Sequence, residues 1–333
     1  MHLPIGFVPY CSGLTLPFLE QGQGITRRRQ KFAREWDTHL KRSCAVQAEW
    51  LGKHPDSTVL ILGAGRLVDC DLPFLLGNNT EVFLVDADPG CEALYQRLKR
   101  AHQRQLNFEI SDITGLLATW TATLKKRMGW EETLETLRSL AGSGVSQLQL
   151  LTQGELALSL NILSQIPIIW RDYVERLLMN RFGKKFVLEN DAAWLEAFAP
   201  CGRYLIEKHL ADLENASYQS LLVITDVEYA TYSGEMATGE SPITWTRTQG
   251  GADSKLIVGE WKEGPELRDA EVSPSLFGVD LEDRAVLKRL FPNYEATLED
   301  SWLWHIEPLG GERKGHGVVH RVSAISLDLS PSV

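Results

Sequence analysis

Small and acidic residues close three short segments of the chain that are rich in apolar residues: Gly63 and Gly65, Asp86, and Asp112. Without side chains, Gly63 and Gly65 would let a ligand approach the backbone amides closely. Asp86 follows about twenty residues later, where a carboxylate can accept hydrogen bonds from both hydroxyls of a ribose. Asp112 can accept one from an adenine amino group, while the aliphatic side chain of Ile113 covers the ring. These residue types and their spacing predict a nucleoside-binding site.

The runs that end in these residues read as strands of one open α/β sheet. Continuous apolar runs alternate with helical segments, which is typical of parallel strands that are buried on both faces. Open sheets of this kind bind ligands at the carboxyl ends of their strands, where the residues above stand. The predicted strands cover residues 58–62, 82–85, 106–110, 156–160 and 221–225.

Helices are predicted from apolar periodicity and from the residues that begin and end it. Asp71 and Asp88 read as helix N-caps, each followed within two residues by a proline. Three longer helical segments are predicted: residues 88–101, residues 167–183, and residues 191–213 with an interruption at Pro200-Cys201-Gly202.

The last third of the chain reads differently, because the helical period disappears between residues 229 and 274. Residues 243–247 and 255–260 predict a hairpin around Gly250-Gly251, within an insertion at about residues 230–280. After a helix over residues 281–290, residues 302–307 and 318–327 predict an antiparallel strand pair at the end of the sheet. The predicted organisation is therefore an N-terminal helical cap (1–55) followed by a core (56–333) that carries the insertion.

The predicted cap is an amphipathic helix over residues 25–51. Its apolar face repeats every fourth residue, at Phe32, Trp36, Leu40 and Cys44. Residues 27–42 carry seven basic and two acidic side chains, a net charge of +5, which leaves −15 for the rest of a chain of net charge −10. The basic face is either a solvated surface against an acidic body or an anion-binding surface.

The composition is that of a folded globular chain, since 44% of its 333 residues are hydrophobic and 23% are charged. Its negative charge disfavours nucleic acids and membranes as partners, so a small-molecule partner is expected. The five cysteines form no CxxC pair and no HxH or HExxH motif occurs, so neither a disulfide framework nor a metal site is predicted. A reducing, cytoplasmic location fits this cysteine usage.

Three motifs in residues 57–226 give the chain its resemblance to class I S-adenosylmethionine-dependent methyltransferases. They are Val-Leu-Ile-Leu-Gly-Ala-Gly (59–65), Val-Phe-Leu-Val-Asp (82–86) and Ser-Asp-Ile (111–113). The resemblance implies a Rossmann-like, mostly parallel seven-stranded sheet with helices on both faces and an antiparallel last strand. It also implies S-adenosylmethionine as cofactor, S-adenosylhomocysteine as product, and methyl transfer as the activity.

The resemblance also assigns cofactor-binding residues in this chain. Gly63, Ala64 and Gly65 would approach the methionine part, Asp86 and Ala87 the ribose, Asp112 and Ile113 the adenine, while Leu160 and Asn161 would lie near the sulfonium. Two positions depart from the family pattern: Ile61 replaces an acidic residue, and Leu67 replaces a frequent third glycine.

Candidate acceptor-site residues are polar side chains at the ends of the fourth and fifth strands: Asn161, Ser164, Gln165, Asp226, Glu228 and Tyr229. Of these, Asn161, Gln165 and Asp226 are the predicted catalytic residues, facing an acceptor that the N-terminal helix covers with Trp36 and Leu40. Asn161 is not followed by the two prolines and aromatic residue of amino-methylating nucleic acid enzymes, which disfavours that class. His39 and His209 read as packed or surface residues within helices.

Two other functions stay open at this point. In the first, the fold serves as a cofactor sensor or partner-binding scaffold without turnover, which the departures at Ile61 and Leu67 allow. In the second, the chain is a nicotinamide-dependent oxidoreductase, whose fingerprint also begins Gly-x-Gly. The bulky Val68 at the third small position of that fingerprint disfavours the oxidoreductase.

Overall fold

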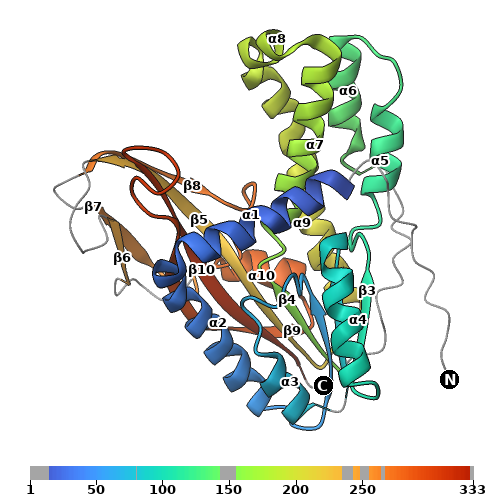
Figure 1. Cartoon of the computed structure of the whole chain (residues 1–333), viewed down its shortest axis with the longest axis vertical. Helices are drawn as coiled ribbons and strands as arrows, with labels where there is room; N and C mark the ends of the chain where they lie inside the picture. The colour runs from blue at the N-terminus through green and yellow to red at the C-terminus, as the bar shows by residue number, and fades with distance from the viewer. Residues whose placement is uncertain are drawn as a thin grey trace.

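The computed structural model describes residues 15–79, 81–142, 155–234, 243–247, 255–263 and 267–330. Its centre is a sheet of strand order β3-β2-β1-β4-β5-β10-β9, with β8 paired to β5 (Figure 1). Strands β1 to β5 pair in parallel, whereas β10 is antiparallel to both β5 and β9. The strands are β1 (Thr58–Leu62), β2 (Glu81–Asp86), β3 (Leu106–Ile110), β4 (Leu156–Leu160), β5 (Ser220–Gly234), β8 (Leu267–Pro274), β9 (Tyr294–Glu307) and β10 (His316–Leu329).

The predicted mostly parallel α/β sheet with an antiparallel end is confirmed, but its strand count is larger by one. Strand β5 is 15 residues long, and its second half pairs with β10 on one side and with β8 on the other. Strand β8 was not predicted, because its sequence LRDAEVSP mixes charged and apolar residues and lacks a continuous apolar run.

Helices cover both faces of the sheet, and the alternation of side chains along each strand explains why. In β1, Leu60 and Leu62 point into one core, while Val59 and Ile61 point into the other. The first core packs against α5, α6, α7 and α9, and the second against α2, α3 and α4. The helices are α1 (Thr15–Lys31), α2 (Ala33–Gly52), α3 (Leu72–Asn78), α4 (Glu92–Ala101), α5 (Leu117–Leu124), α6 (Trp130–Leu140), α7 (Gln165–Phe182), α8 (Lys184–Glu189), α9 (Asp191–Asn215) and α10 (Arg284–Leu290), with a 3₁₀ turn η1 (Pro89–Cys91).

The predicted single cap helix is wrong, because two helices, α1 and α2, meet at the buried Phe32. The buried face of α2 runs through Trp36, His39, Ser43, Val46, Gln47 and Trp50. Leu40 and Cys44 are only half-buried, since a strict four-residue step drifts by about 40° per step around a helix of 3.6 residues per turn. In the basic segment of residues 27–42, which spans both helices, Arg28 of α1 pairs with Glu312 at 3.1 Å. This pairing fits a solvated face against an acidic body.

The predicted interruption at Pro200 is also wrong, because α9 is one continuous helix of 25 residues that contains this proline. A proline inside a helix costs about 3 kcal/mol, since it removes a backbone donor and crowds the preceding turn. Phe198, Cys201 and Leu205 are fully buried around it, and this packing offsets the cost.

Among the described helices, none combines the length and the apolar character needed to span a bilayer.

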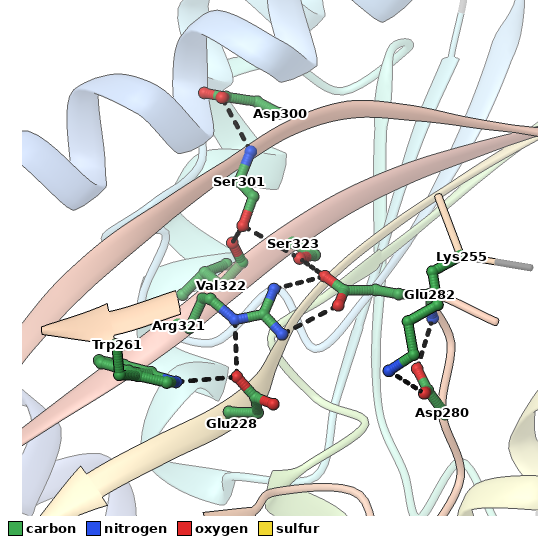
Figure 2. Close-up of polar contacts among 10 residues, drawn as sticks. All are labelled: Glu228, Lys255, Trp261, Asp280, Glu282, Asp300, Ser301, Arg321, Val322 and Ser323. Carbon is green, nitrogen blue, oxygen red and sulfur yellow. Dashed lines mark hydrogen bonds and ion pairs between the residues drawn. The ribbon is translucent and has the colours of Figure 1, made fainter. Parts of the chain in front are cut away.

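The predicted hairpin forms a separate two-stranded sheet of β6 (Ile243–Arg247) and β7 (Gly259–Glu263). The second strand begins four residues later than predicted, and the predicted turn at Gly250-Gly251 lies outside the described residues. A cluster of charged side chains around the buried Arg321 ties this hairpin to β10 (Figure 2). Arg321 donates to Glu228 at 2.8 Å and to both oxygens of Glu282 at 2.5 and 2.9 Å, and Trp261 donates to Glu228 at 3.0 Å.

Candidate functional site

A cavity lies where the carboxyl ends of β1, β2 and β4 face α1 and α2. It encloses about 890 Å³, counting the open space at its mouth. Six of the predicted site residues that line it come from the strand ends: Gly63, Gly65, Asp86, Ala87, Leu160 and Asn161. The other walls come from α1 (Phe18, Gln21, Gly22, Ile25), α2 (Trp36, His39, Leu40), α7 (Gln165, Ile169) and β9 (Trp304).

The turn after β1 has the backbone conformation that its glycines allow. Gly63 has φ +78°, and a Cβ atom there would lie 2.7 Å from the carbonyl oxygen of Leu160. Leu67 has φ +56°, so the loop adopts a glycine-like conformation at the position where the family often has glycine. That left-handed geometry costs a leucine about 1–2 kcal/mol. Ala64 is buried in the core and does not line the cavity.

Asp86 ends β2 and faces the cavity, as predicted. Its Oδ2 accepts from the Gly65 amide at 2.8 Å and its Oδ1 from the Asp88 amide at 2.7 Å. Burial raises the pKa of Asp86 to about 6, against the lowering effect of these hydrogen bonds. Each carboxylate oxygen keeps a further lone-pair direction for a ligand hydroxyl.

Asp112 and Ile113, the predicted adenine contacts, do not line the cavity. Asp112 Oδ1 accepts from the amide and hydroxyl of Thr114 at 2.9 and 2.8 Å, and Oδ2 accepts from the Leu117 amide at 3.0 Å. Ile113 is buried in the core. Asp112 therefore holds the turn that enters α5, a role that the spacing Asp-x-Thr could have indicated.

Asn161 and Gln165 both line the cavity at the end of β4, as predicted. Asn161 has φ +49°, and its Nδ2 donates to Asp69 Oδ2 at 2.5 Å, while its Oδ1 is buried without a described partner. Gln165 Oε1 accepts from Gln21 of α1, so a side-chain hydrogen bond holds the cap to the strand end. Gly22 lets α1 lie directly on Asp88, because a Cβ atom there would be 2.0 Å from Asp88 Oδ2.

Asp226, the third predicted catalytic residue, is buried and does not line the cavity. It accepts from Ser164 Oγ at 2.6 Å and pairs with His320 Nδ1 at 2.8 Å. Burial alone would raise the pKa of Asp226, but the interactions with His320 and Ser164 outweigh it and lower the pKa. Gln165 Nε2 donates to Ser164 Oγ at 3.5 Å, so Ser164 and Gln165 link Asp226 to the cavity.

His39 lines the cavity, although it was predicted only as a packed or surface residue of a helix. Its ring stacks on Trp304 at 4.1 Å between centroids with 9° between planes, and its Nδ1 accepts from Trp302 Nε1 at 3.0 Å. Burial lowers the pKa of His39 to about 3, so the ring is neutral at physiological pH. An indole nitrogen can only donate, so the proton of His39 sits on Nε2. The one sequence signal was its place three residues after Trp36 on the apolar side of the helix.

The cavity lining is rich in carboxylates. Asp69, Asp86 and Asp88 all line it, and Arg66 is the one cation among its described lining residues. Arg66 lies 3.6 Å from Asp88, and its Nε is buried without a described partner. Burial raises the pKa of Asp69, against the hydrogen bond from Asn161 and the charge of Arg29. The site therefore suits a ligand that carries positive charge.

No protein-family model and no curated protein matches the chain. Among solved structures, it is similar to an S-adenosylmethionine-dependent methyltransferase from Clostridium acetobutylicum ATCC 824, with 8% identity over 92% of this chain and 98% of that one (TM-score 0.35). It is also similar to the 1,6-didemethyltoxoflavin-N1-methyltransferase of Burkholderia thailandensis, with 11% identity over 94% and 91% (TM-score 0.36). A third is the branched-chain polyamine synthase of Thermus thermophilus, with 10% identity over 86% and 55% (TM-score 0.32).

Proposed function

We propose that this chain is an S-adenosylmethionine-dependent methyltransferase that acts on a small molecule. One observation carries the proposal: one cavity gathers five of the eight predicted cofactor residues at the carboxyl ends of three neighbouring parallel strands. Gly63 and Gly65 lie in the turn after β1, Asp86 and Ala87 at the end of β2, and Leu160 at the end of β4. When bound, S-adenosylmethionine supplies an electrophilic methyl group on a positively charged sulfur.

The polar groups of the cavity fit this cofactor. Its sulfonium and ammonium charges complement the carboxylates of Asp69 and Asp86, while its ribose can donate to Asp86. Two buried atoms without a described partner, Asn161 Oδ1 and Arg66 Nε, offer an acceptor and a donor to the ammonium and carboxylate of its amino acid part.

A nicotinamide cofactor fits the cavity poorly. Its pyrophosphate would face Asp69, Asp86 and Asp88 with Arg66 as counter-ion. Dinucleotide sites also place a helix N-terminus at the glycine turn, where its free amides bind phosphate. Here α3 begins only at Leu72, and Asp71 already accepts from the Phe74 amide at 3.1 Å.

Helices α1 and α2 cover the proposed acceptor site. Phe18 and Ile25 from α1 and Trp36 from α2 place apolar surface over the strand ends, which excludes water from the site. A bulky nucleic acid would have to displace α1, so a small acceptor enters more readily. Asn161 and Gln165 are proposed to contact the acceptor, and Asp226 to position Gln165 through Ser164.

Titration calorimetry with S-adenosylhomocysteine and with NADH tests the proposal. We expect S-adenosylhomocysteine to bind, and Asp86→Ala to weaken binding by about 1–3 kcal/mol through the lost charged hydrogen bonds. Asp37→Ala, which removes a surface carboxylate paired with Lys41, is the matched control and should leave the affinity unchanged. Binding of NADH without S-adenosylhomocysteine would contradict the proposal. Binding without consumption of the methyl donor would instead identify a non-catalytic cofactor sensor.

A further inference from the structure

Two polar groups face each other inside the cavity without being bonded to each other. His39 Nε2 and Asp69 Oδ2 lie 4.0 Å apart, and both residues line the cavity. We propose that the methyl acceptor is a hydroxyl group, which binds between these two atoms and loses its proton to Asp69. This inference rests on the proposed methyl transfer and names its acceptor class.

His39 serves as a fixed hydrogen-bond donor. Trp302 occupies its Nδ1, and the stacked Trp304 ring holds the plane of the imidazole. The Nε2 proton is therefore directed away from Trp302, on the side where Asp69 lies. Since its Nε2 already carries the proton, neutral His39 can donate to an acceptor oxygen but cannot take its proton there.

Asp69 serves as a fixed acceptor and as the base. Its backbone carbonyl accepts from Ser43 Oγ at 3.2 Å and from Gln47 Nε2 at 2.7 Å, so α2 positions Asp69 as well as His39. Asn161 Nδ2 donates to its Oδ2. Burial raises the pKa of this carboxyl, which makes it a better proton acceptor than an exposed aspartate.

A donor and an acceptor at this spacing select for one kind of ligand group. An ammonium can donate to Asp69 but has no lone pair for His39, and a carboxylate is repelled by Asp69. A neutral amine has a single lone pair, which the bond to His39 would withhold from attack. A hydroxyl donates to Asp69, accepts from His39, and keeps a second lone pair as the nucleophile. The neighbouring rings of Trp36 and Trp304 suit an apolar or aromatic skeleton.

The chemistry balances with the groups present. The hydroxyl O–H bond breaks and its proton moves to Asp69 Oδ2. The oxygen lone pair forms the bond to the methyl carbon, and the electron pair of the broken carbon–sulfur bond stays on sulfur. His39 Nε2–H donates to the oxygen while it is negatively charged, which stabilises that charge in a site sheltered from water.

Binding of matched fragments to the protein saturated with S-adenosylhomocysteine tests the inference by ligand-observed NMR. Phenol should bind about tenfold tighter than toluene, because toluene leaves both polar groups unpaired. His39→Phe should reduce this preference below threefold without changing the affinity for S-adenosylhomocysteine. His54→Phe, outside the cavity lining, should keep it.

Phenol and toluene affinities within threefold of each other, or tighter binding of benzylammonium than of phenol, would overturn the hydroxyl acceptor alone. Failure to bind S-adenosylhomocysteine would overturn the proposed function itself. A transfer assay with phenol, aniline and thiophenol gives a second readout: anisole should be the main methylated product, and Asp69→Asn should suppress it. N-methylaniline or thioanisole in excess would contradict the inference.

Discussion

Among single residues, Asp86 should make the ligand affinity of the site depend on pH. Its pKa of about 6 means that the carboxylate charge is lost as the pH falls through about 6. A ligand that binds the charged form must then bind more weakly at low pH. The dissociation constant for S-adenosylhomocysteine should rise about tenfold between pH 7 and pH 5, measured by calorimetry. Asp86→Asn should bind weakly at both values, and a wild-type affinity independent of pH would contradict this role.

Gly63 offers a test of the glycine turn on stability. Gly63→Ala would place a Cβ atom 2.7 Å from the Leu160 carbonyl at φ +78°, so we expect a loss of about 2 kcal/mol or more in the free energy of unfolding. Gly77→Ala in α3 is the matched control, since a Cβ atom there meets nothing within 4 Å. Urea denaturation should show the control to be neutral or stabilised by up to about 1 kcal/mol. Equal effects of the two substitutions would contradict the tight-turn explanation.

Some residues that line the cavity can be located from the local sequence, whereas others cannot. Gly63, Asp86 and Asn161 were predictable, because each directly ends an apolar strand and parallel strand ends meet at one edge. His39 and Asp69 also line the cavity but were not predicted to do so. The first comes from a helix before the sheet and the second from the loop after β1, so tertiary packing alone brings them together.

At the scale of elements, the Arg321 cluster holds the β6–β7 hairpin against the sheet (Figure 2). Burial would lower the pKa of Arg321, but the hydrogen bonds and charges of Glu282 and Glu228 outweigh it and raise the pKa. Glu282→Ala leaves the buried guanidinium short of a partner, so unfolding should become easier by about 3–5 kcal/mol. Asp37→Ala at an exposed ion pair should change stability little. Similar urea midpoints for wild type and Glu282→Ala would rule out a structural role for the cluster.

The elements that were predicted correctly carry strong local signals. Strands β1, β3 and β4 begin and end where predicted, because each is flanked by polar or glycine residues. The break at Phe32 and the continuous α9 depend on burial against distant segments, as does the pairing of β8. Local sequence cannot show such packing, which overrides turn and proline signals.

At the scale of the whole molecule, charge should keep nucleic acids away. Outside residues 27–42 the chain carries −15, and Arg28 within that segment is paired with Glu312. Duplex binding depends on basic side chains that displace counter-ions from phosphates. We expect no retarded band with duplex DNA or RNA at micromolar protein and physiological salt. A retarded band that weakens steeply with salt would contradict the small-molecule assignment.

The cavity between the strand ends and α1–α2 is the proposed S-adenosylmethionine site. A crystal structure of the protein with S-adenosylhomocysteine tests it most directly. We predict the ligand in this cavity, with its ribose hydroxyls within hydrogen-bond distance of Asp86 and its sulfur directed toward Asn161. A ligand bound elsewhere, or one whose ribose has no contact with Asp86, would contradict the account.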